Sequence, residues 1–431
     1  METAWINIWN TRVGAVAWNP STGLGTFEFE PSFISKNLDL APLKMPVSEA
    51  GKRTFTFPEM RNNSAFKGLP GLLADTLPDK YGNEIINNWL SRRGRPSNSL
   101  NPVEMLCFIG KRGMGALEFE PDESKLSARS TKIEISDLVK IANIILSGRQ
   151  DFSTDITHNE EKALVDILKI STSAGGARAK AVIAFDPVTK EVRSGQAEVP
   201  KSFEHWIIKF DGVADNQFGA SYGYGRVEMA YHLMAKDAGI EMAECRLLEE
   251  NKRAHFMTRR FDREPGKGKI HMQSFCAMQH YDFNEVNLYS YEQLFETMRM
   301  LGLPYPEAEQ LFRRMVFNVL ARNCDDHTKN FAFLMDKSGQ WKLSPAFDLC
   351  YSYRPGSVWV SQQSLSVNGK RQKITSEDLL SVAKQMNIKR APHIINHVSD
   401  TVNNWQNYAE ETKVDSKLNS TINSTLSDFN R

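Results

Sequence analysis

The stretch that decides the fold class reads DDHTKN, or Asp325-Asp326-His327-Thr328-Lys329-Asn330. It places the carboxylate of Asp325 five positions before the amide of Asn330, and a further carboxylate follows at Asp348 in LSPAFD, residues 343–348. These three side chains supply the oxygen atoms that a hard divalent metal carrying phosphates prefers. The pattern therefore predicts a metal-dependent, phosphate-handling site that residues 325–348 build.

The same interval separates the Asp and the Asn of the kinase catalytic loop, H-R-D-x-x-x-x-N. In this interpretation Asp325 is the base or hydroxyl-orienting group, and Asn330 and Asp348 hold Mg²⁺ against the phosphates of ATP. The alternative is a polar loop after an apolar helix, with the carboxylates as caps. Asp326 lies beside Asp325, so spacing alone leaves open which carboxylate acts. Likewise, His327 and Lys329 either face phosphate or cap the loop.

Composition narrows the class of protein. The chain has 431 residues, 41% of them hydrophobic and 24% charged, which is typical of a globular protein with two or three domains. A net charge of +1 argues against a protein that coats nucleic acid by electrostatics alone. The five cysteines never form C-x-x-C, so we expect neither structural zinc nor a disulfide framework. No apolar run approaches ~18 residues, and no signal peptide is recognisable, so we expect no membrane contact and a cytoplasmic location.

Hydrophobic patterning predicts a strand-rich N-terminal half and a helical C-terminal half. We expect an α+β, two-lobed, kinase-like fold with an added N-terminal module and an all-α C-terminal lobe. Its parts would be the module at 1–124, a lobe with connector, ATP loop and hinge at 125–263, and a helical lobe with the catalytic loop and a polar tail at 264–431. Strands are predicted at 5–9, 26–30, 117–121, 181–185, 205–210, 246–250 and 254–258. Helices are predicted at 82–93, 135–146, 162–170, 226–238, 291–301, 306–320, 378–386 and 392–408, with 415–431 either a marginal helix or a disordered tail.

A lysine closes one of the predicted strands. Lys209 follows the apolar run Trp206-Ile207-Ile208, as the lysine of V-A-I-K does in kinases, where it meets the α- and β-phosphates. Glu228, in the next predicted helix, is the obvious partner for a structural ion pair. A strand-end lysine in water is the alternative, and the order Lys209, Glu228, Asp325, Asn330, Asp348 is what favours the kinase interpretation.

A glycine-bearing loop precedes the strand at 181–185. Its residues are Gly175, Gly176, Ala177, Arg178, Ala179 and Lys180. Glycines let backbone N–H groups approach phosphates closely, so the loop could cradle ATP. It is neither a Walker A loop nor the G-x-G-x-x-G of ordinary protein kinases, and a hairpin turn is the alternative. Ser171 and Ser173 lie just upstream and are candidate phosphorylation sites.

The segment Arg259-Arg260-Phe261 lies where the predicted lobes would join. Its backbone groups could read the edge of adenine, with Phe261 packing nearby. A buried strand end with a salt bridge is the equally simple alternative.

Taken together, these segments resemble the HipA family of bacterial serine/threonine kinase toxins. The similarity in the predicted lobes rests on residues 173–180, Ile207-Ile208-Lys209, Arg260-Phe261-Asp262-Arg263, the D-x-H-x-K-N-F string of 325–331 and Pro345-Ala346-Phe347-Asp348. In the N-terminal module it rests on 27–31, 40–47, 72–79 and 109–117.

The resemblance implies roles for individual residues. Asp325 would be catalytic, Asn330 and Asp348 would bind Mg²⁺, and Lys209 would meet the phosphates of ATP. The nucleotide site would be completed by Gly175, Gly176, Ala177, Arg178, Ala179, Lys180, Arg259, Arg260, Phe261, His327, Thr328, Lys329, Asn330 and Phe347. Autophosphorylation in the family falls seven positions before the loop lysine, here Ser173, with Ser171 as the neighbouring candidate. A charge of about −2 beside bound triphosphate would switch the kinase off.

The resemblance also implies partners. Members pair with a small helix-turn-helix antitoxin, HipB, and reach operator DNA through that complex. The best-known protein substrate is glutamyl-tRNA synthetase, whose phosphorylation arrests growth. This chain departs from the best-known member in reading Gly-Gly-Ala-Arg-Ala-Lys in the phosphate loop and Arg259 in place of Glu, which puts a shared substrate in doubt. The alternatives are a catalytically idle corepressor and a small-molecule phosphotransferase on the same fold.

Overall fold

The computed structural model of the chain describes residues 3–123, 131–146, 165–168, 170, 178–195, 199–215, 219–220, 222–264 and 268–426. They form two compact units. The first comprises Met1–Leu38, Val47–Gly225 and Glu244–His271, and the second comprises Asp39–Pro46, Arg226–Ala243 and Met272–Arg431. The first unit therefore contains most of both the predicted N-terminal module and the predicted strand-rich lobe.

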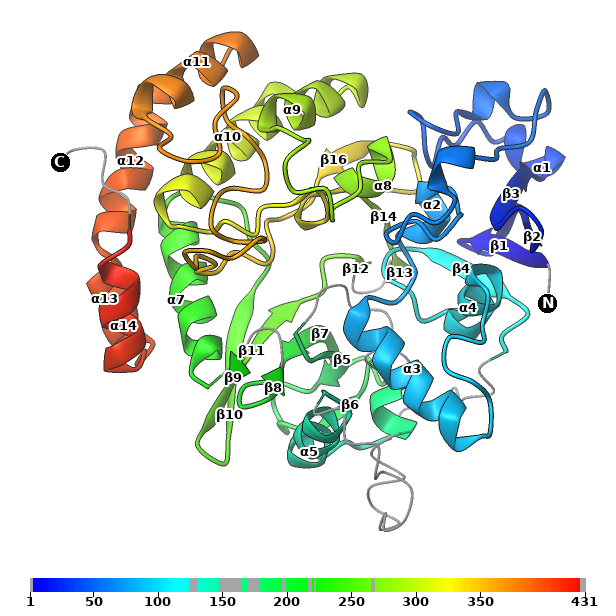
Figure 1. Cartoon of the computed structure of the whole chain (residues 1–431), viewed down its shortest axis with the longest axis horizontal. Coiled ribbons are helices and arrows are strands. Elements are labelled where there is room, and N and C mark those ends of the chain that lie inside the picture. The colour runs from blue at the N-terminus through cyan, green and yellow to red at the C-terminus, as the bar shows by residue number, and fades with distance from the viewer. Residues whose placement is uncertain are drawn as a thin grey trace. The chain divides into compact units, whose positions relative to one another are not determined.

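An antiparallel sheet opens the first unit, and its four described strands run in the order β3-β2-β1-β4 (Figure 1). Their bounds are β1 (Thr3–Ile8), β2 (Thr11–Asn19), β3 (Leu24–Phe29) and β4 (Leu117–Glu120). The predicted alternation is present in β3, where Phe27 and Phe29 are buried and Glu28 is exposed. Successive side chains of a strand point to opposite faces, so one face of this sheet joins the core.

The described part of the first unit also contains helices. They are α1 (Pro31–Ile34), α2 (Gly71–Ala74), α3 (Lys80–Arg92), α4 (Pro102–Ile109) and α5 (Ile135–Leu146), with 3₁₀ turns at Val47–Glu49 and Pro58–Met60. Helix α4 begins at Pro102, where Asn101 and Glu104 form a capping box with two hydrogen bonds of 2.9 Å. Helix α4 then packs on β1, β2 and β4.

A second antiparallel sheet in the first unit follows the order β10-β11-β7-β5-β6 within the described residues. Its strands are β5 (Lys180–Phe185), β6 (Val192–Ser194), β7 (Glu204–Lys209), β10 (Cys245–Glu250) and β11 (Arg253–Arg259). Two small hairpins add β8 (Ala214–Asp215) with β9 (Gly219–Ala220) and β12 (Arg263–Glu264) with β13 (Gly268–Lys269). Every residue of β5 is buried, which explains its uninterrupted apolar run after Lys180.

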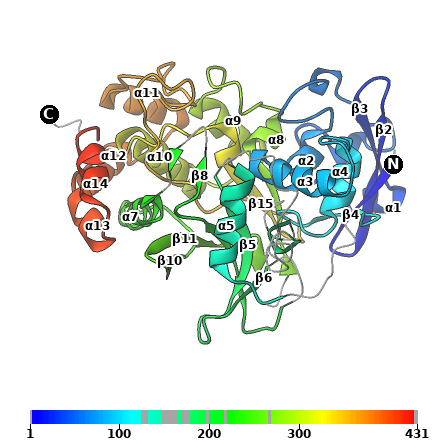
Figure 2. The same ribbon diagram turned by 60° about the horizontal axis from the view of Figure 1, so that its bottom comes forward.

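Helices dominate the second unit. They are α7 (Tyr224–Asp237), α8 (Phe275–Gln279), α9 (Tyr291–Met300), α10 (Tyr305–Leu320), α11 (Ser376–Met386), α12 (Ala391–Asn403), α13 (Trp405–Glu411) and α14 (Ser416–Asn423). Helix α12 packs against α10, and α13 packs against α14 near the C-terminus in both ribbon views (Figures 1 and 2). Of the two alternatives for the tail, the structure shows a helix over 416–423.

Two predictions about this unit are wrong in detail. The helix expected over 392–408 is interrupted at Asn404, where the fully buried Trp405 begins a new helix and donates its indole N–H to Asn419 Oδ1 at 2.8 Å. The all-α expectation also misses a sheet of order β14-β15-β16, made of His271–Ser274, Ala332–Met335 and Trp341–Leu343. These strands have only three or four residues each, too few to carry a periodic signal, so the hydrophobic pattern did not predict them.

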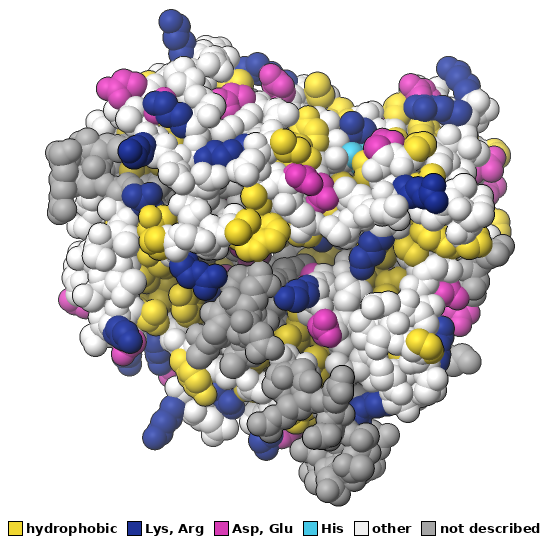
Figure 3. All heavy atoms as spheres, viewed as in Figure 1, with side chains coloured by type: hydrophobic (Ala, Val, Ile, Leu, Met, Phe, Trp, Pro, Cys, Tyr) yellow, Lys and Arg dark blue, Asp and Glu magenta, His cyan; other side chains and the backbone are white. Residues whose placement is uncertain are grey.

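The surface and the core agree with the composition. On the face shown in Figure 3, basic and acidic side chains are interspersed, as the near-neutral net charge leads one to expect. All five cysteines are buried. Within the part of the chain that the structure describes, no helix is long and apolar enough to span a membrane. Of the predicted helix 162–170, the structure describes residues 165–168 and 170, and these are helical.

Candidate active site

The DDHTKN loop follows helix α10 in the second unit and is closed by its own hydrogen bonds. Asn330 donates its side-chain Nδ2 to the carbonyl of Asp325 at 2.6 Å, and its backbone N–H to His327 at 2.9 Å. The first bond turns the Asn330 side-chain oxygen, the atom that a metal would use, away from that carbonyl. The five-residue interval is thus a closed turn that holds an amide beside the predicted base.

The two adjacent aspartates have opposite environments. The Asp325 side chain is 47% exposed, whereas Asp326 is 1% exposed. Asp326 accepts the Tyr291 hydroxyl and the backbone N–H of Ser364, both at 2.7 Å. Burial raises the pKa of Asp326 to about 7 against the lowering effect of these donors. A substrate hydroxyl can therefore reach Asp325 far more readily than Asp326.

The remaining loop side chains divide between surface and core. Thr328 is buried and donates its hydroxyl to the carbonyl of Tyr281 at 2.9 Å, so this side chain anchors the loop rather than facing a ligand. His327 Nε2 lies 3.8 Å from Asp325 Oδ1. The ammonium of Lys329 lies 5.3 Å from the ring centroid of Phe283, a cation–π distance. His327 Nδ1 accepts the backbone N–H of Lys329 at 3.3 Å, so this ring caps the loop, as one of the two alternatives held, and the phosphate role stays a prediction for both side chains.

The β15–β16 hairpin brings the two predicted metal ligands to one end of the same element. Asn330 precedes β15 and Asp348 follows β16, and antiparallel pairing of Phe333 with Leu343 joins the strands. The start of β15 and the end of β16 therefore lie at the open end of the hairpin. Asp348 has φ +54°, a left-handed conformation that is uncommon for a residue other than glycine and that recurs at functional sites.

The donor set fits magnesium better than a metal held wholly by protein. Among the described residues, no group of three or more His, Cys, Asp or Glu side chains could hold a metal ion. Mg²⁺ usually takes one or two protein oxygen ligands and completes its octahedron with water and substrate phosphates. One carboxylate from Asp348 and one amide oxygen from Asn330 match that requirement.

Two lysines face each other in the five-stranded sheet of the first unit. Lys180 opens β5 and Lys209 ends β7, and they are directly paired in the antiparallel register. Directly opposite residues carry their side chains on one face, with Cβ atoms about 5 Å apart. Lys180 is buried, and the Lys209 ammonium lies 5.8 Å from the ring centroid of Phe256. Two ammonium groups on one face, at the same end of neighbouring strands, suit an anion such as a polyphosphate.

The predicted phosphate loop is described only in its last residues. Ser171, Ser173, Gly175, Gly176 and Ala177 lie outside the described residues. Arg178 stacks over the ring of Tyr224 at 4.4 Å, and the carbonyl of Ala179 accepts the N–H of Phe210 at 3.0 Å. These contacts anchor the C-terminal end of the loop next to Lys180.

The predicted adenine segment ends β11. The N–H of Arg259 donates to Glu244 at 2.8 Å and that of Arg260 to His205 at 2.9 Å, so neither donor is available to a ligand. Ion pairs at 3.5 and 3.4 Å link the Arg259 side chain to Glu204 and Glu244. The Arg260 side chain pairs with a buried carboxylate, as the salt-bridge alternative required. Any adenine contact here would therefore use carbonyl groups and the half-buried ring of Phe261.

Two predicted residues remain to be placed. Glu228 is 3% exposed in α7, and Phe347 is half-buried before Asp348. Lys209 belongs to the first unit and Glu228 to the second, so their ion pair stays a prediction.

Sequence reasoning did not predict what two buried carboxylates contact. Asp262 binds the neighbouring arginines, and Asp326 accepts hydrogen bonds from Tyr291 and Ser364. The motif RFDR contains Asp262, and the doubled aspartate of DDH contains Asp326. In each motif the sequence therefore showed a carboxylate to which no role had been assigned, and this was the one indication of its burial and pairing.

Together, the paired lysines of the first unit and the D-x-x-x-x-N loop of the second belong to a chain of kinase-like fold. Residues 172–406 match the description HipA-like C-terminal domain, and residues 4–120 match HipA N-terminal domain. The first match alone covers more than half of the chain, and the chain belongs to the HipA family.

Two solved structures and one curated protein are similar to this chain. The fold resembles a chain in the Shewanella oneidensis complex of HipA, HipB and operator DNA, with a TM-score of 0.69 at 15% identity over 98% of this chain and 94% of that one. A curated Sinorhizobium fredii protein, Y4dM, which carries the provisional name of a kinase, is 24% identical over 220 residues. That match spans 45% of this chain and 49% of Y4dM, or about half its length. The Helicobacter pylori kinase CtkA gives a TM-score of only 0.34 at 14% identity, over 58% of this chain and 92% of that one.

Proposed function

We propose that this chain is an ATP- and Mg²⁺-dependent serine/threonine protein kinase that acts as a toxin. The observation that carries the proposal is the closed loop in which Asn330 holds the carbonyl of the half-exposed Asp325 at 2.6 Å, with Asp348 at the same end of the hairpin. A substrate hydroxyl needs a reachable base, and the metal needs oxygen ligands close to it.

Each residue has a defined task in this proposal. Asp325 accepts the proton of the attacking hydroxyl, or orients that hydroxyl. Lys180 and Lys209 neutralise the phosphates from one face of the sheet. Asn330 and Asp348 would hold Mg²⁺, which when bound neutralises charge on the phosphates. Because neither Arg259 nor Arg260 has a backbone N–H to spare, adenine recognition falls to their carbonyls and to Phe261.

The finer parts of the proposal follow the family. Autophosphorylation on Ser173, or on Ser171, would add charge next to the phosphate loop and switch the kinase off. A HipB-like antitoxin would neutralise the toxin in the cytoplasm and connect it to operator DNA. The protein substrate would be a component of translation, such as glutamyl-tRNA synthetase. The three-part division at residues 124 and 263 belongs to the same proposal.

The test is phosphosite mapping by mass spectrometry after incubation of the purified chain with Mg²⁺ and ATP, beside Asp325→Ala. We expect phosphate on Ser173 or Ser171 in the wild type only, and ATP binding in both proteins. Asp326→Asn is the matched variant, because it alters the neighbouring carboxylate, and it should retain transfer. Transfer by Asp325→Ala would refute the assigned base. An inactive wild type that still binds ATP would favour the idle corepressor or a non-protein substrate.

A further inference from the structure

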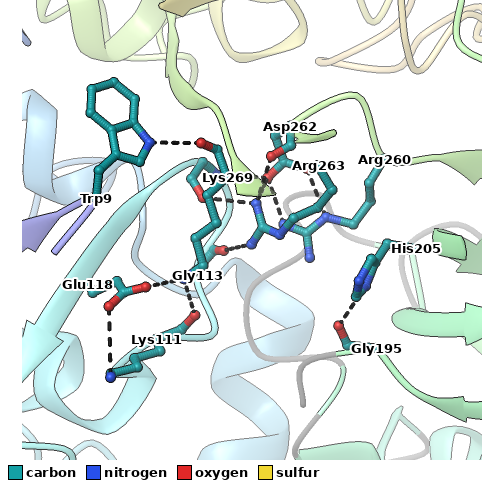
Figure 4. Close-up of polar contacts among 11 residues, drawn as sticks. Trp9, Lys111, Gly113, Glu118, Gly195, His205, Arg260, Asp262, Arg263 and Lys269 are labelled. Atoms are coloured by element: carbon teal, nitrogen blue, oxygen red, sulfur yellow. Dashed lines mark hydrogen bonds and ion pairs between the residues drawn. The ribbon is translucent and has the colours of Figure 1, made fainter. Parts of the chain in front are cut away.

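The turn after β11 contains a buried cluster of charges (Figure 4). Arg260 grips Asp262 with two hydrogen bonds, Nε to Oδ1 at 2.8 Å and Nη2 to Oδ2 at 2.6 Å, and both side chains are fully buried. Arg263 adds a third contact, from Nη1 to Asp262 Oδ2 at 2.8 Å. One carboxylate thus binds two guanidinium groups from its own turn.

The same carboxylate reaches the N-terminal module. Gly115 donates its N–H to Asp262 Oδ2 at 2.7 Å. In return, Arg263 donates to the carbonyls of Gly115 and Gly113 at 2.9 and 3.1 Å. Gly115 has φ +73°, a conformation that glycine adopts without strain. In this conformation its N–H donates to Asp262 while its carbonyl accepts from Arg263. These contacts join segments that are 147 residues apart in the chain.

The electrostatics show a carboxylate that stays charged. Burial is the largest influence on Asp262 and would raise its pKa, but Arg260 and Arg263 outweigh it and hold the pKa below the ordinary value. Burial lowers the pKa of Arg263 to about 10, so it remains a cation at neutral pH. Buried ion pairs often add little net stability, because desolvation offsets their attraction. A better-attested contribution of buried ion pairs is to specify one geometry. The effect to look for is therefore on the position of the neighbouring backbone.

The geometry that the cluster specifies is that of residues 259–261. The N–H of Arg260 donates to the carbonyl of His205 in the sheet, and the N–H of Ile270 donates to the carbonyl of Asp262 at 3.0 Å. The turn is thus bound on one side to the sheet and on the other to the N-terminal module. A shift of either attachment would move the carbonyls at the end of β11.

A second connection lies farther from this segment. Lys269 in β13 donates to Glu118 at 2.8 Å and to the carbonyl of Lys111 at 2.7 Å, and its own carbonyl accepts the indole N–H of Trp9 at 2.7 Å (Figure 4). This connection also joins the module to the hairpin but does not include Asp262. It therefore offers a control for attachment of the module as such.

We propose that Asp262 is a positioning residue for adenine recognition, through which the Gly113–Gly115 loop of the N-terminal module holds residues 259–261 in the shape that binds the base. The inference rests on the proposed function, because it assumes that this segment meets adenine. It makes the N-terminal module a structural part of the nucleotide site.

The test compares two ligands in the full chain, Mg²⁺–ATP and Mg²⁺–triphosphate, by titration calorimetry. Triphosphate lacks the base, so the ratio of the two affinities isolates adenine recognition from phosphate binding. Asp262→Asn removes the charge from the cluster. Arg263→Lys keeps its charge but cannot keep the two-armed contact with Gly113 and Gly115. Each should lower ATP affinity roughly tenfold, as expected for the loss of a charge-assisted hydrogen bond, and leave triphosphate affinity within about twofold.

The matched control is Glu118→Gln, which weakens the Lys269 connection and leaves Asp262 untouched. It should lower the melting temperature while preserving the ratio of the two affinities. A ratio that stays unchanged in both cluster variants, or failure of both to fold, would overturn the inference and leave the cluster a purely structural role. The inference would also be overturned if the wild-type chain bound Mg²⁺–ATP no more tightly than Mg²⁺–triphosphate. A wild type that binds neither ligand would instead refute the proposed function itself, and this inference with it.

Discussion

Replacing Asp326 with Asn should change how stability depends on pH. The buried carboxyl of Asp326 has a pKa of about 7, against 3.8 for an unperturbed aspartate. The folded state therefore binds this proton more tightly than the unfolded state does. The stabilising contribution is complete below pH 3.8 and is lost as pH rises through about 7.

The magnitude follows from the size of the shift. Roughly three pKa units at about 1.4 kcal/mol each amount to about 4 kcal/mol over the full range. About 3 kcal/mol of this stabilisation is lost between pH 5 and pH 8, as the linkage relation for one titrating group gives. The Asn variant does not ionise. From pH 5 to pH 8 the free energy of unfolding of the wild type should therefore fall by that amount relative to that of the variant. Other groups titrate equally in both proteins and cancel in the difference.

The assay is urea unfolding of both proteins at pH 5, 6, 7 and 8, without nucleotide, followed by tryptophan fluorescence. Asp325→Asn is the companion variant, in which phosphoryl transfer should be lost because this half-exposed carboxylate is the proposed base. A difference between Asp326→Asn and wild type that stays constant with pH would refute the reasoning. It would mean that Tyr291 and Ser364 stabilise the carboxylate enough to cancel its desolvation.

Two further outcomes are expected. Asp348→Ala should weaken ATP binding in the presence of Mg²⁺ by about tenfold or more, because one of the two proposed protein oxygen ligands is lost. ATP binding without the metal should stay nearly unchanged. Calorimetry with and without Mg²⁺ measures both affinities, and an equal loss in both would contradict the assigned role. Ser173→Asp should inactivate the kinase by placing negative charge near the phosphate loop, while Ser173→Ala stays active; wild-type turnover of a peptide substrate by the aspartate variant would exclude autoinhibition.

Local sequence predicted most of the elements because their signals act over a few residues. The capping box of α9, in which Ser290 and Gln293 exchange side-chain and backbone hydrogen bonds, is an interaction across three positions. The alternation of β3 is likewise local. The break at Asn404 was not predictable in this way, since it accompanies a contact between Trp405 and Asn419 that the helical pattern of 392–408 does not contain.

The candidate site divides along the same line. The interval from Asp325 to Asn330 is a local property, and the chain alone indicated which side chains could act there. Which of the two adjacent aspartates is reachable was decided by Tyr291 and Ser364, both more than thirty positions away. No periodicity distinguishes neighbours in a loop, so only packing could separate them.

The sequence by itself determined which side chains are available for the proposed chemistry, with Lys209, Glu228, Asp325, Asn330 and Asp348 in the order that a kinase has. Tertiary structure decided their geometry. Lys180 and Lys209 face each other because strands β5 and β7 adopt one register, and Asp262 meets Gly115 because two distant segments pack together. The physical reason is that register and packing depend on the total burial achieved by many residues at once, which no short stretch of sequence contains.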